Sequence, residues 1–370
     1  MTETESESPF DFAAHGNSAV ARYLPRQAFY GDLASVVKRI VMESLDRRGI
    51  KVQSVEARPK DAASLSKKAA QPSESDPSMP KYPDPLAQIT DLAGIRIITY
   101  FPGTLTEIDQ LLQHEFDVVE RSDKGAELVQ EDRFGYQSVH YLVRISQQRA
   151  ALPEYQRFGN SITEVQVRTI LQHAWAEIEH DIQYKSASVI PTEIRRRFGS
   201  LAGMLEMADR EFQAIQDEDR ALAEEARARV EGGQLEDVEI TPDSLKAFLD
   251  KRLGPDGRIS DFSYDWEARL LKRLGFRTLE QVSKTIAEYD DDELSRIAEG
   301  SRQGQTTRFE LMLLAGMGER YIDRHPWSSM AWFRDRHAVH LQEFRDAGAE
   351  IQDYDPRDDG TANSPSERPM

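Results

Sequence analysis

The sequence contains no cysteine, and none of its apolar runs is long enough to span a membrane. The first absence excludes disulfides, thiolate zinc sites and a cysteine nucleophile, and it fits a reducing, cytoplasmic environment. The second excludes a membrane-spanning helix. The N-terminal stretch MTETESESPFDF has neither the basic nor the apolar region of a secretory signal, so we expect no signal peptide.

Basic residues are also fewer than acidic ones, and the excess of acidic residues varies along the chain. The net charge is −18, with 21 Lys+Arg against 23 Asp+Glu over residues 21–190 and a net of −12 over residues 191–370. Non-specific polyanion binding depends on basic surface, so the chain is a poor candidate for it. A local basic pocket for a small phosphate ligand is still compatible with this composition.

The length of 370 residues predicts two domains rather than one. We expect an α/β (α+β) domain, a mixed sheet flanked by helices, followed by a small all-α domain. The expected ranges are a disordered acidic tail at 1–18, the first domain with a long C-terminal helix at 19–232, the all-α accessory domain at 238–350, and a disordered tail at 351–370.

Periodicity supports the mixed first domain. A helical pattern covers residues 21–48, and a proline-rich loop is expected at Ala70–Pro85. Helices are also predicted for AASLSKKAA, LQHAWAEIEHDIQYK and TLTEIDQLLQHEF, the last with its N-cap at Thr104 or Thr106. Strands are predicted for residues 52–60, DLAGIRIITYF, FDVVERS, YQSVHYLVRIS and ITEVQVRT.

The rest of the chain reads as helical. Apolar residues recur every three or four positions from Phe198 to Ile215, which predicts a long amphipathic helix to about Val230. Beyond residue 240 there is little strand signal. Thr241 followed by Pro242, and a Thr278/Gln281 capping box, mark two helix starts.

Two of the predicted strands carry a chemically equipped face. Side chains two apart on a strand point the same way, so Tyr136, Ser138 and His140 share one face of FGYQSVHYLV. Glu164, Gln166 and Arg168 do the same in ITEVQVRT, with valines on the other face.

A cluster of cations precedes them. Arg58 and Lys60 share a strand face, and Ser64 and Lys68, four apart, share a helix face. Cations and a hydroxyl that converge in this way can hold a polyphosphate. The plainer interpretation is a solvated strand end and helix.

Two acids could serve a metal. If the strands are neighbours, Asp91 and Glu164 could share Mg²⁺ with substrate phosphates, although each could equally be a cap or a surface acid. The pair His180–Asp181 invites a second interpretation, an HD-type phosphohydrolase, but the further helical His and Asp ligands are missing. There is no G-x-x-x-x-G-K-[ST] P-loop.

Taken in order, DLAGIRI, GYQSVHY, and EVQVRT followed by a helix with EHDIQYK resemble the synthetase domain of the RelA/SpoT family, which makes the alarmone (p)ppGpp. The short synthetases without a hydrolase domain are the nearest match, over about residues 20–215. The segment VEARPK departs from the pattern, with Ala57 where the family usually has Gly.

This resemblance implies a nucleotidyltransferase-like fold, Mg²⁺, and transfer of pyrophosphate from ATP to GDP or GTP. Asp91 and Glu164 would be the metal carboxylates, Glu164 also polarising the attacking hydroxyl. Arg58 and Arg96 would sandwich the adenine, and Lys60, Ser64 and Lys68 would grip the ATP phosphates. On the acceptor side the resemblance implies Tyr136 stacking on guanine, with His140, Gln166 and His173, and with Arg121 or Arg133 adding charge.

Two other functions compete with this one. A toxin-type relative would pyrophosphorylate the 3′ end of tRNA, but only the Arg195–Arg197 triplet offers a basic cluster. A non-catalytic nucleotide sensor would not need both metal carboxylates. The resemblance also suggests a homo-oligomer, and the C-terminal helical domain could bind a protein partner or modulate activity.

Overall fold

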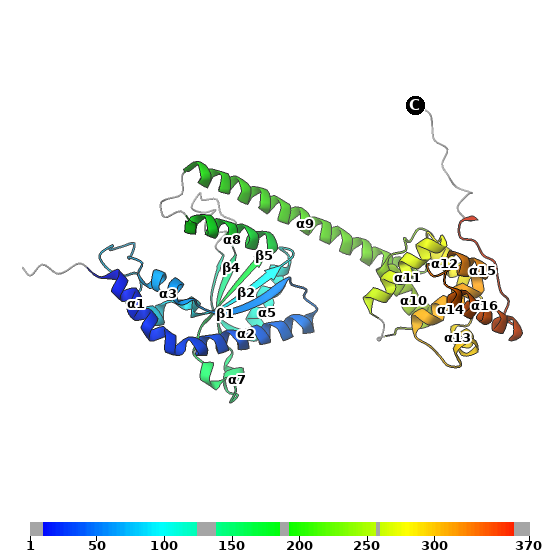
Figure 1. Ribbon diagram of the computed structural model, residues 1–370, viewed down its shortest axis with the longest axis horizontal. Helices are drawn as coiled ribbons and strands as arrows, with labels where there is room; N and C mark the ends of the chain where they lie inside the picture. Colours follow the sequence, from blue (N-terminus) through cyan, green and yellow to red (C-terminus); the bar gives the residue numbers. More distant parts are fainter. Residues whose placement is uncertain (1–9, 124–137, 186–191, 257–259, 359–370) are drawn as a thin grey trace, which may run out of the picture. The chain divides into compact units, whose positions relative to one another are not determined.

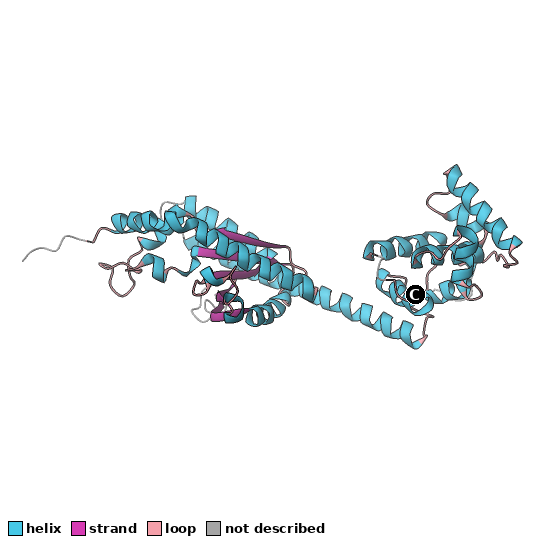
Figure 2. Cartoon of the chain, turned by 90° about the horizontal axis from the view of Figure 1, so that it is seen from below, coloured by secondary structure: helices cyan, strands magenta, loops and turns pink. Residues whose placement is uncertain are grey.

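The computed structural model describes residues 10–123, 138–185, 192–256 and 260–358. The chain divides into two compact units, Met1–Gln216 and Asp217–Met370. In the described residues all five strands belong to the first unit, while the second is helical (Figure 2). No helix in these residues is both long and apolar enough to cross a membrane.

The first unit is built on a five-stranded mixed sheet with the strand order β1-β2-β5-β4-β3. The β2–β5 pair is parallel and the other three pairs are antiparallel. The strands are β1 (Ser54–Pro59), β2 (Ala93–Thr99), β3 (Phe116–Asp123), β4 (Val139–Ile145) and β5 (Thr163–Thr169). The expected mixed sheet flanked by helices is therefore confirmed.

Helices cover both faces of this sheet (Figure 1). The helices α2 (Gln27–Arg48) and α5 (Thr104–Glu115) pack on one face, where alternate strand residues such as Ile95, Tyr141 and Val165 form the buried core. The helix α8 (Ile170–Lys185) lies on the opposite side, where Trp175 packs against α9 (Thr192–Gly232). Because side chains alternate along each strand, one face of the sheet is apolar and the other is polar.

The N-terminal helix and a short helix before β2 pack against each other beside the sheet. The helix α1 (Phe12–Tyr23) is capped by Asp11, and it contacts α3 (Ala62–Ala69). The expected disordered tail at 1–18 is thus wrong from Phe12 onward. Sequence reasoning missed this start because the Asp cap precedes only a weak apolar pattern. The helix α5 also begins after Gly103, not at a threonine cap.

The second unit is a bundle with its own buried core. Its helices are α10 (Pro242–Leu253), α11 (Asp261–Leu274), α12 (Leu279–Ile286), α13 (Asp291–Glu299), α14 (Gln305–Met317), α15 (Glu319–Arg324) and α16 (Ala331–Asp346). Both predicted helix starts are confirmed: Thr241 and Thr278 each form a capping box, and Pro242 takes the first turn.

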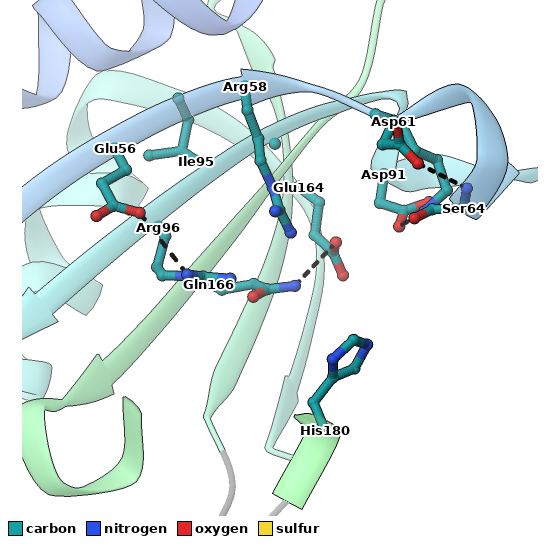
Figure 3. A pocket seen from close by; sticks show the side chains of 12 residues that line it. Glu56, Arg58, Asp61, Ser64, Asp91, Ile95, Arg96, Glu164, Gln166 and His180 are labelled. Atoms are coloured by element: carbon teal, nitrogen blue, oxygen red, sulfur yellow. Dashed lines mark hydrogen bonds and ion pairs between the residues drawn. The ribbon is translucent and has the colours of Figure 1, made fainter. Parts of the chain in front are cut away.

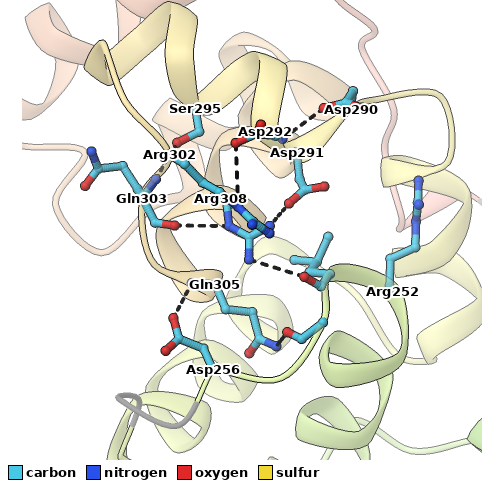
Figure 4. A network of polar contacts seen from close by, with 12 residues as sticks. Arg252, Asp256, Asp290, Asp291, Asp292, Ser295, Arg302, Gln303, Gln305 and Arg308 are labelled. Atoms are coloured by element: carbon cyan, nitrogen blue, oxygen red, sulfur yellow. Dashed lines mark hydrogen bonds and ion pairs between the residues drawn. The ribbon is translucent and has the colours of Figure 1, made fainter.

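A buried arginine ties the helical unit together (Figure 4). Arg308 on α14 is 3 % exposed, pairs with Asp291 at the start of α13, and donates to the carbonyls of Gln303 and Leu253. The C-terminal segment also packs here, because Asp355 accepts hydrogen bonds from Arg320 and Arg324. The expected tail at 351–370 is therefore ordered as far as the described residues reach, to position 358.

Candidate active site

A pocket of about 270 Å³ opens on the polar face of the sheet (Figure 3). Strand β1 supplies Arg58 and strand β5 supplies Glu164 and Gln166, while His180 enters from α8. The remaining lining residues are Glu56 of β1, Ser64 of α3, Gly94, Ile95 and Arg96 of β2, and Lys60, Asp61 and Asp91 just outside these elements.

The register of the strands explains why these residues meet. Arg58 of β1 lies opposite Gly94 of β2, and Gly94 in turn lies opposite Glu164 of β5. Residues paired across neighbouring strands point to the same face. The glycine leaves open space between the arginine and the carboxylate, since an added Cβ would come within 3.7 Å of the Arg58 carbonyl oxygen and no other neighbour.

Asp91 stands at the entry to β2 between two lysines. Its Oδ2 accepts from Lys60, and its Oδ1 lies 3.2 Å from the Lys68 Nζ. Burial alone would raise the pKa of the Asp91 carboxyl, but the hydrogen bonds and charges of Lys60 and Lys68 outweigh it and hold the pKa below its usual range. Asp91 is therefore ionised at neutral pH, and both lysines converge on it.

Glu164 is held from two sides. The His140 Nδ1 donates to its Oε1 over 2.8 Å, and the Gln166 Nε2 donates to its Oε2 over 3.2 Å. Ser138 lies 2.7 Å from the other ring nitrogen of His140. Because a carboxylate can only accept, the Nδ1 of His140 carries the proton. The carboxylate is thus fixed in orientation by neighbours on two strands.

The chain of contacts continues to a buried guanidinium. Arg168 is 8 % exposed and donates from Nη2 to the Gln166 Oε1 over 2.7 Å. Its Nε has no hydrogen-bond partner among the described residues. Burial first, and then the charge of Arg96, lower the pKa of Arg168 to about 10, so it stays charged at pH 7. Arg168 fixes the amide of Gln166, whose Nε2 then faces Glu164.

Arg96 is surrounded by acids that sequence reasoning did not select. Its Nη1 lies 3.2 Å from Glu177 of α8 and 3.7 Å from Glu56 of β1. Glu177 also lies 3.7 Å from the His173 Nδ1. Burial, followed by the charge of Arg96, lowers the pKa of His173. Glu177 therefore contacts both Arg96, which was expected on the ATP side, and His173, which was expected on the acceptor side.

The structure brings most of the expected site residues together but not all. Arg121 was expected on the acceptor side of the site, but it does not lie in the pocket. It pairs across the strands with Tyr141 and donates to Asp109 of α5 over 3.2 Å, so it lies on the core face of the sheet. A register shift between Val118 and Glu120 separates it from the regular alternation of β3. Tyr136 and Arg133 lie outside the described residues.

Three charged or polar lining residues were not among the expected site residues. Glu56, Asp61 and His180 all line the cavity. Glu56 could have been found, because it lies two residues before Arg58 on the same strand face. Asp61 was visible as the cap of α3, where its Oδ1 accepts from the Ser64 N–H over 2.9 Å. The approach of His180 depends on how α8 crosses the sheet, which the sequence does not state.

The pocket on this mixed sheet combines carboxylates with arginine and lysine side chains, which makes it a candidate site for phosphate-bearing ligands. Comparison with known proteins gives the family. Residues 57–189 match the family model described as the region found in RelA/SpoT proteins. These residues are therefore a RelA/SpoT region, and the family expected from the three motifs is confirmed.

Named relatives are similar to part of the chain. GTP pyrophosphokinase YjbM of Bacillus subtilis (strain 168) is 27% identical over 169 residues, which are 45% of this chain and 73% of the relative. GTP pyrophosphokinase YwaC of the same strain is 28% identical over 131 residues, 35% of this chain and 59% of that one. The small alarmone synthetase 1 structure from Bacillus subtilis is 23% identical, covering 54% of this chain and 99% of that chain, with a TM-score of 0.43.

Proposed function

We propose that the chain is an alarmone synthetase that transfers pyrophosphate from ATP to the 3′-hydroxyl of GDP or GTP, giving (p)ppGpp. The observation that carries the proposal is the pocket in which Asp91 and Glu164 face Arg58, Lys60 and Arg96. The RelA/SpoT region and the names of the two pyrophosphokinase relatives support it. A cytoplasmic location follows from the substrates, which are cytoplasmic nucleotides.

The donor half of the site suits ATP. Arg58 and Arg96 project from the neighbouring strands β1 and β2, and planar guanidinium groups stack well on a purine ring. Lys60 and Ser64 line the same cavity, and Lys68 reaches it through Asp91. These donors are placed to hold a triphosphate, with Lys60 and Lys68 exchanging Asp91 for phosphate oxygens.

The charge of the pocket indicates why a divalent cation is required. Three cations, Arg58, Lys60 and Arg96, line it against four carboxylates, Glu56, Asp61, Asp91 and Glu164. Two polyphosphates cannot be neutralised by a lining of this kind. Among the described residues no group of three or more His, Asp or Glu forms a metal cage. Two carboxylates completed by phosphate oxygens fit Mg²⁺, which we assign to Asp91 and Glu164.

The metal, when bound, would offset the charge that develops on the transferred group. The chain's own residues position the acceptor. Glu164, fixed by His140 and Gln166, is placed to take the proton of the 3′-hydroxyl as that oxygen bonds to the β-phosphorus of ATP. The bond from the β-phosphorus to the α-phosphate oxygen breaks, and AMP leaves. The acceptor contact of His173 and the stacking by Tyr136 stay predictions. The catalysis is positioning and electrostatics.

The deciding experiment follows the fate of the label from ATP labelled at the γ-phosphate. We incubate the full chain with Mg²⁺ and either GDP, GTP or bulk tRNA, and separate the products. Label in a guanosine 3′-diphosphate supports the proposal, and Glu164→Gln abolishes it. Glu107→Gln on α5, on the other face of the sheet, is the matched control and keeps the wild-type rate.

Two other results would replace the proposal. Label transferred to tRNA alone would assign the toxin-type activity. Binding of nucleotides without any transfer would assign a sensor. Assembly into a homo-oligomer is part of the proposal by resemblance, and light scattering of the purified chain tests it separately.

A further inference from the structure

A second cavity, of about 290 Å³, lies in the C-terminal unit, which the RelA/SpoT match does not reach. It is formed by α13, α14, α16 and the loop between α15 and α16. Two tryptophans, Trp327 and Trp332, supply its aromatic side. The volume is at the low end of the range for small-molecule sites, roughly 300–1,000 Å³.

The two tryptophans are exposed yet held in place. Trp327 is 43% exposed and Trp332 is 57% exposed, although indoles of this size usually find cover in a folded domain. Their ring centroids are 5.8 Å apart with the planes at 46°. Trp327 stacks on Trp266 of α11 at 5.6 Å, and the buried Phe333 makes an edge contact with each of the two indole rings. Two aromatic faces are thus presented in a fixed arrangement.

The polar side of the cavity is negative. Glu299 and Glu310 line it against a single permanent cation, Arg336, whose Nη2 already donates to the Glu299 Oε1. Of the two histidines in the lining, His340 is already engaged by Arg336 and Glu343. Burial lowers the pKa of His337, and the His340 Nε2 accepts a hydrogen bond from Arg336 over 3.3 Å, so that nitrogen carries no proton. One negative charge is left uncompensated.

Buried groups behind the cavity supply hydrogen bonds that make Glu310 an acceptor. The buried Tyr321 hydroxyl donates to the Glu310 Oε2 over 2.7 Å. Glu267 of α11 is 1% exposed, and burial together with the neighbouring Glu310 carboxylate raises its pKa. A neutral Glu267 can donate to Glu310. Glu310 is the member of the pair that lines the cavity.

We propose that this cavity binds an organic cation, an alkylammonium or alkylguanidinium group, with its apolar stem against Trp327 and Trp332 and its charge at Glu310. Aromatic faces attract cations through their quadrupole, and the uncompensated carboxylate adds Coulomb attraction. An anionic or nucleotide ligand would meet two carboxylates and no available cation. The surrounding unit, residues 217–370, agrees with this sign, with 34 Asp+Glu against 22 Lys+Arg.

The test is a titration of the full chain with three probes that share a butyl chain and differ in charge: butylammonium, butanol and butanesulfonate. Tryptophan fluorescence and calorimetry report binding. Butylammonium binds with a Kd of about 1–20 mM, the range expected of a five-atom ligand, and more weakly as salt is raised. Butanol binding equally well, butanesulfonate binding better, or no butylammonium binding up to about 100 mM would overturn the proposal.

Variants locate the site. Trp332→Leu keeps an apolar side chain at an exposed position and weakens butylammonium by about 2- to 30-fold, the span of measured cation–aromatic contacts. Glu310→Gln weakens it about threefold or more. Phe262→Leu and Glu319→Gln are the matched controls, both exposed and outside the lining, and leave the affinity unchanged. Unchanged affinity in Trp332→Leu refutes the site even if Glu310→Gln does not fold.

The same titration separates two sources of the cation. A glycine-rich peptide with one internal lysine or arginine is compared with butylammonium and butylguanidinium. Tighter binding of the peptide assigns the cavity to a basic side chain of a polypeptide partner. Equal or weaker binding of the peptide assigns it to a free amine or guanidine. Both results depend on the cation site and support it.

Discussion

Replacement of Asp91 by asparagine separates two effects that the geometry couples. The carboxylate is paired with Lys60 and Lys68, and its pKa lies below the usual range, so it is ionised at neutral pH. Asparagine has nearly the same shape and no charge. We therefore expect a folded protein that has lost one metal ligand and released two lysines.

The loss of the carboxylate lowers activity, whereas the release of the lysines favours ATP binding. Loss of the carboxylate lowers the rate of pyrophosphate transfer by about 10²- to 10⁴-fold, because charge stabilisation of several kcal/mol is removed. The released ammonium groups face the donor phosphates instead. Metal-free binding of ATP is then unchanged or tighter by about 3- to 10-fold, since each partly exposed pair contributes roughly 0.2–1 kcal/mol.

The assays are label transfer with Mg²⁺ and calorimetry with a non-hydrolysable ATP analogue in EDTA. Asp117→Asn on β3, exposed and outside the pocket, is the control and behaves as wild type. A rate within about threefold of wild type would show that Asp91 is no metal ligand. Loss of metal-free ATP binding would show that its task is to position the lysines.

Three further predictions concern other parts of the molecule. Glu177→Gln removes the partner 3.2 Å from Arg96, and it raises the KM for ATP by about 2- to 5-fold with a smaller change in kcat, because the Glu177 side chain is more than half exposed. An effect on kcat alone would contradict this. His325 is fully buried, and burial lowers its pKa to about 4, below the unfolded value near 6.5. The neutral His325 contributes its full stability above about pH 6.5, and this contribution is lost as the pH falls toward 4. The free energy of unfolding, measured in urea titrations, falls by about 3 kcal/mol over that range, and His325→Phe reduces this pH dependence. Arg308→Met leaves Asp291 unpaired and lowers the free energy of unfolding of the helical unit by about 2–4 kcal/mol. Urea unfolding of the full chain, monitored by tryptophan fluorescence, measures this loss. An unchanged midpoint would show that the pair is not stabilising.

Local chemistry made the strand faces and helix starts predictable from the sequence. The alternation in ITEVQVRT fixed Glu164 and Gln166 on one face whatever the neighbouring strands turned out to be. The capping boxes at Thr241 and Thr278 involve residues only three apart. Such features depend on torsion angles and on contacts within one turn, so the order of residues along the chain determines them.

Contacts between separate elements could be decided only by the tertiary structure. The grouping of Glu56, Arg96 and Glu177 requires the antiparallel register of β1 on β2 and the crossing of α8 over the sheet. The irregular register of β3 placed Arg121 beside Tyr141 on the core face, so its positive charge, visible in the sequence, does not serve the pocket.

The cavity of the C-terminal unit is the extreme case. Its tryptophans and acids come from α13, α14, α16 and a loop, and no short spacing links them. Their meeting depends on how the helices pack around a shared core, which is a property of the whole unit. The sequence by itself therefore determined the elements, their polar faces and the family, while packing decided which charges face one another.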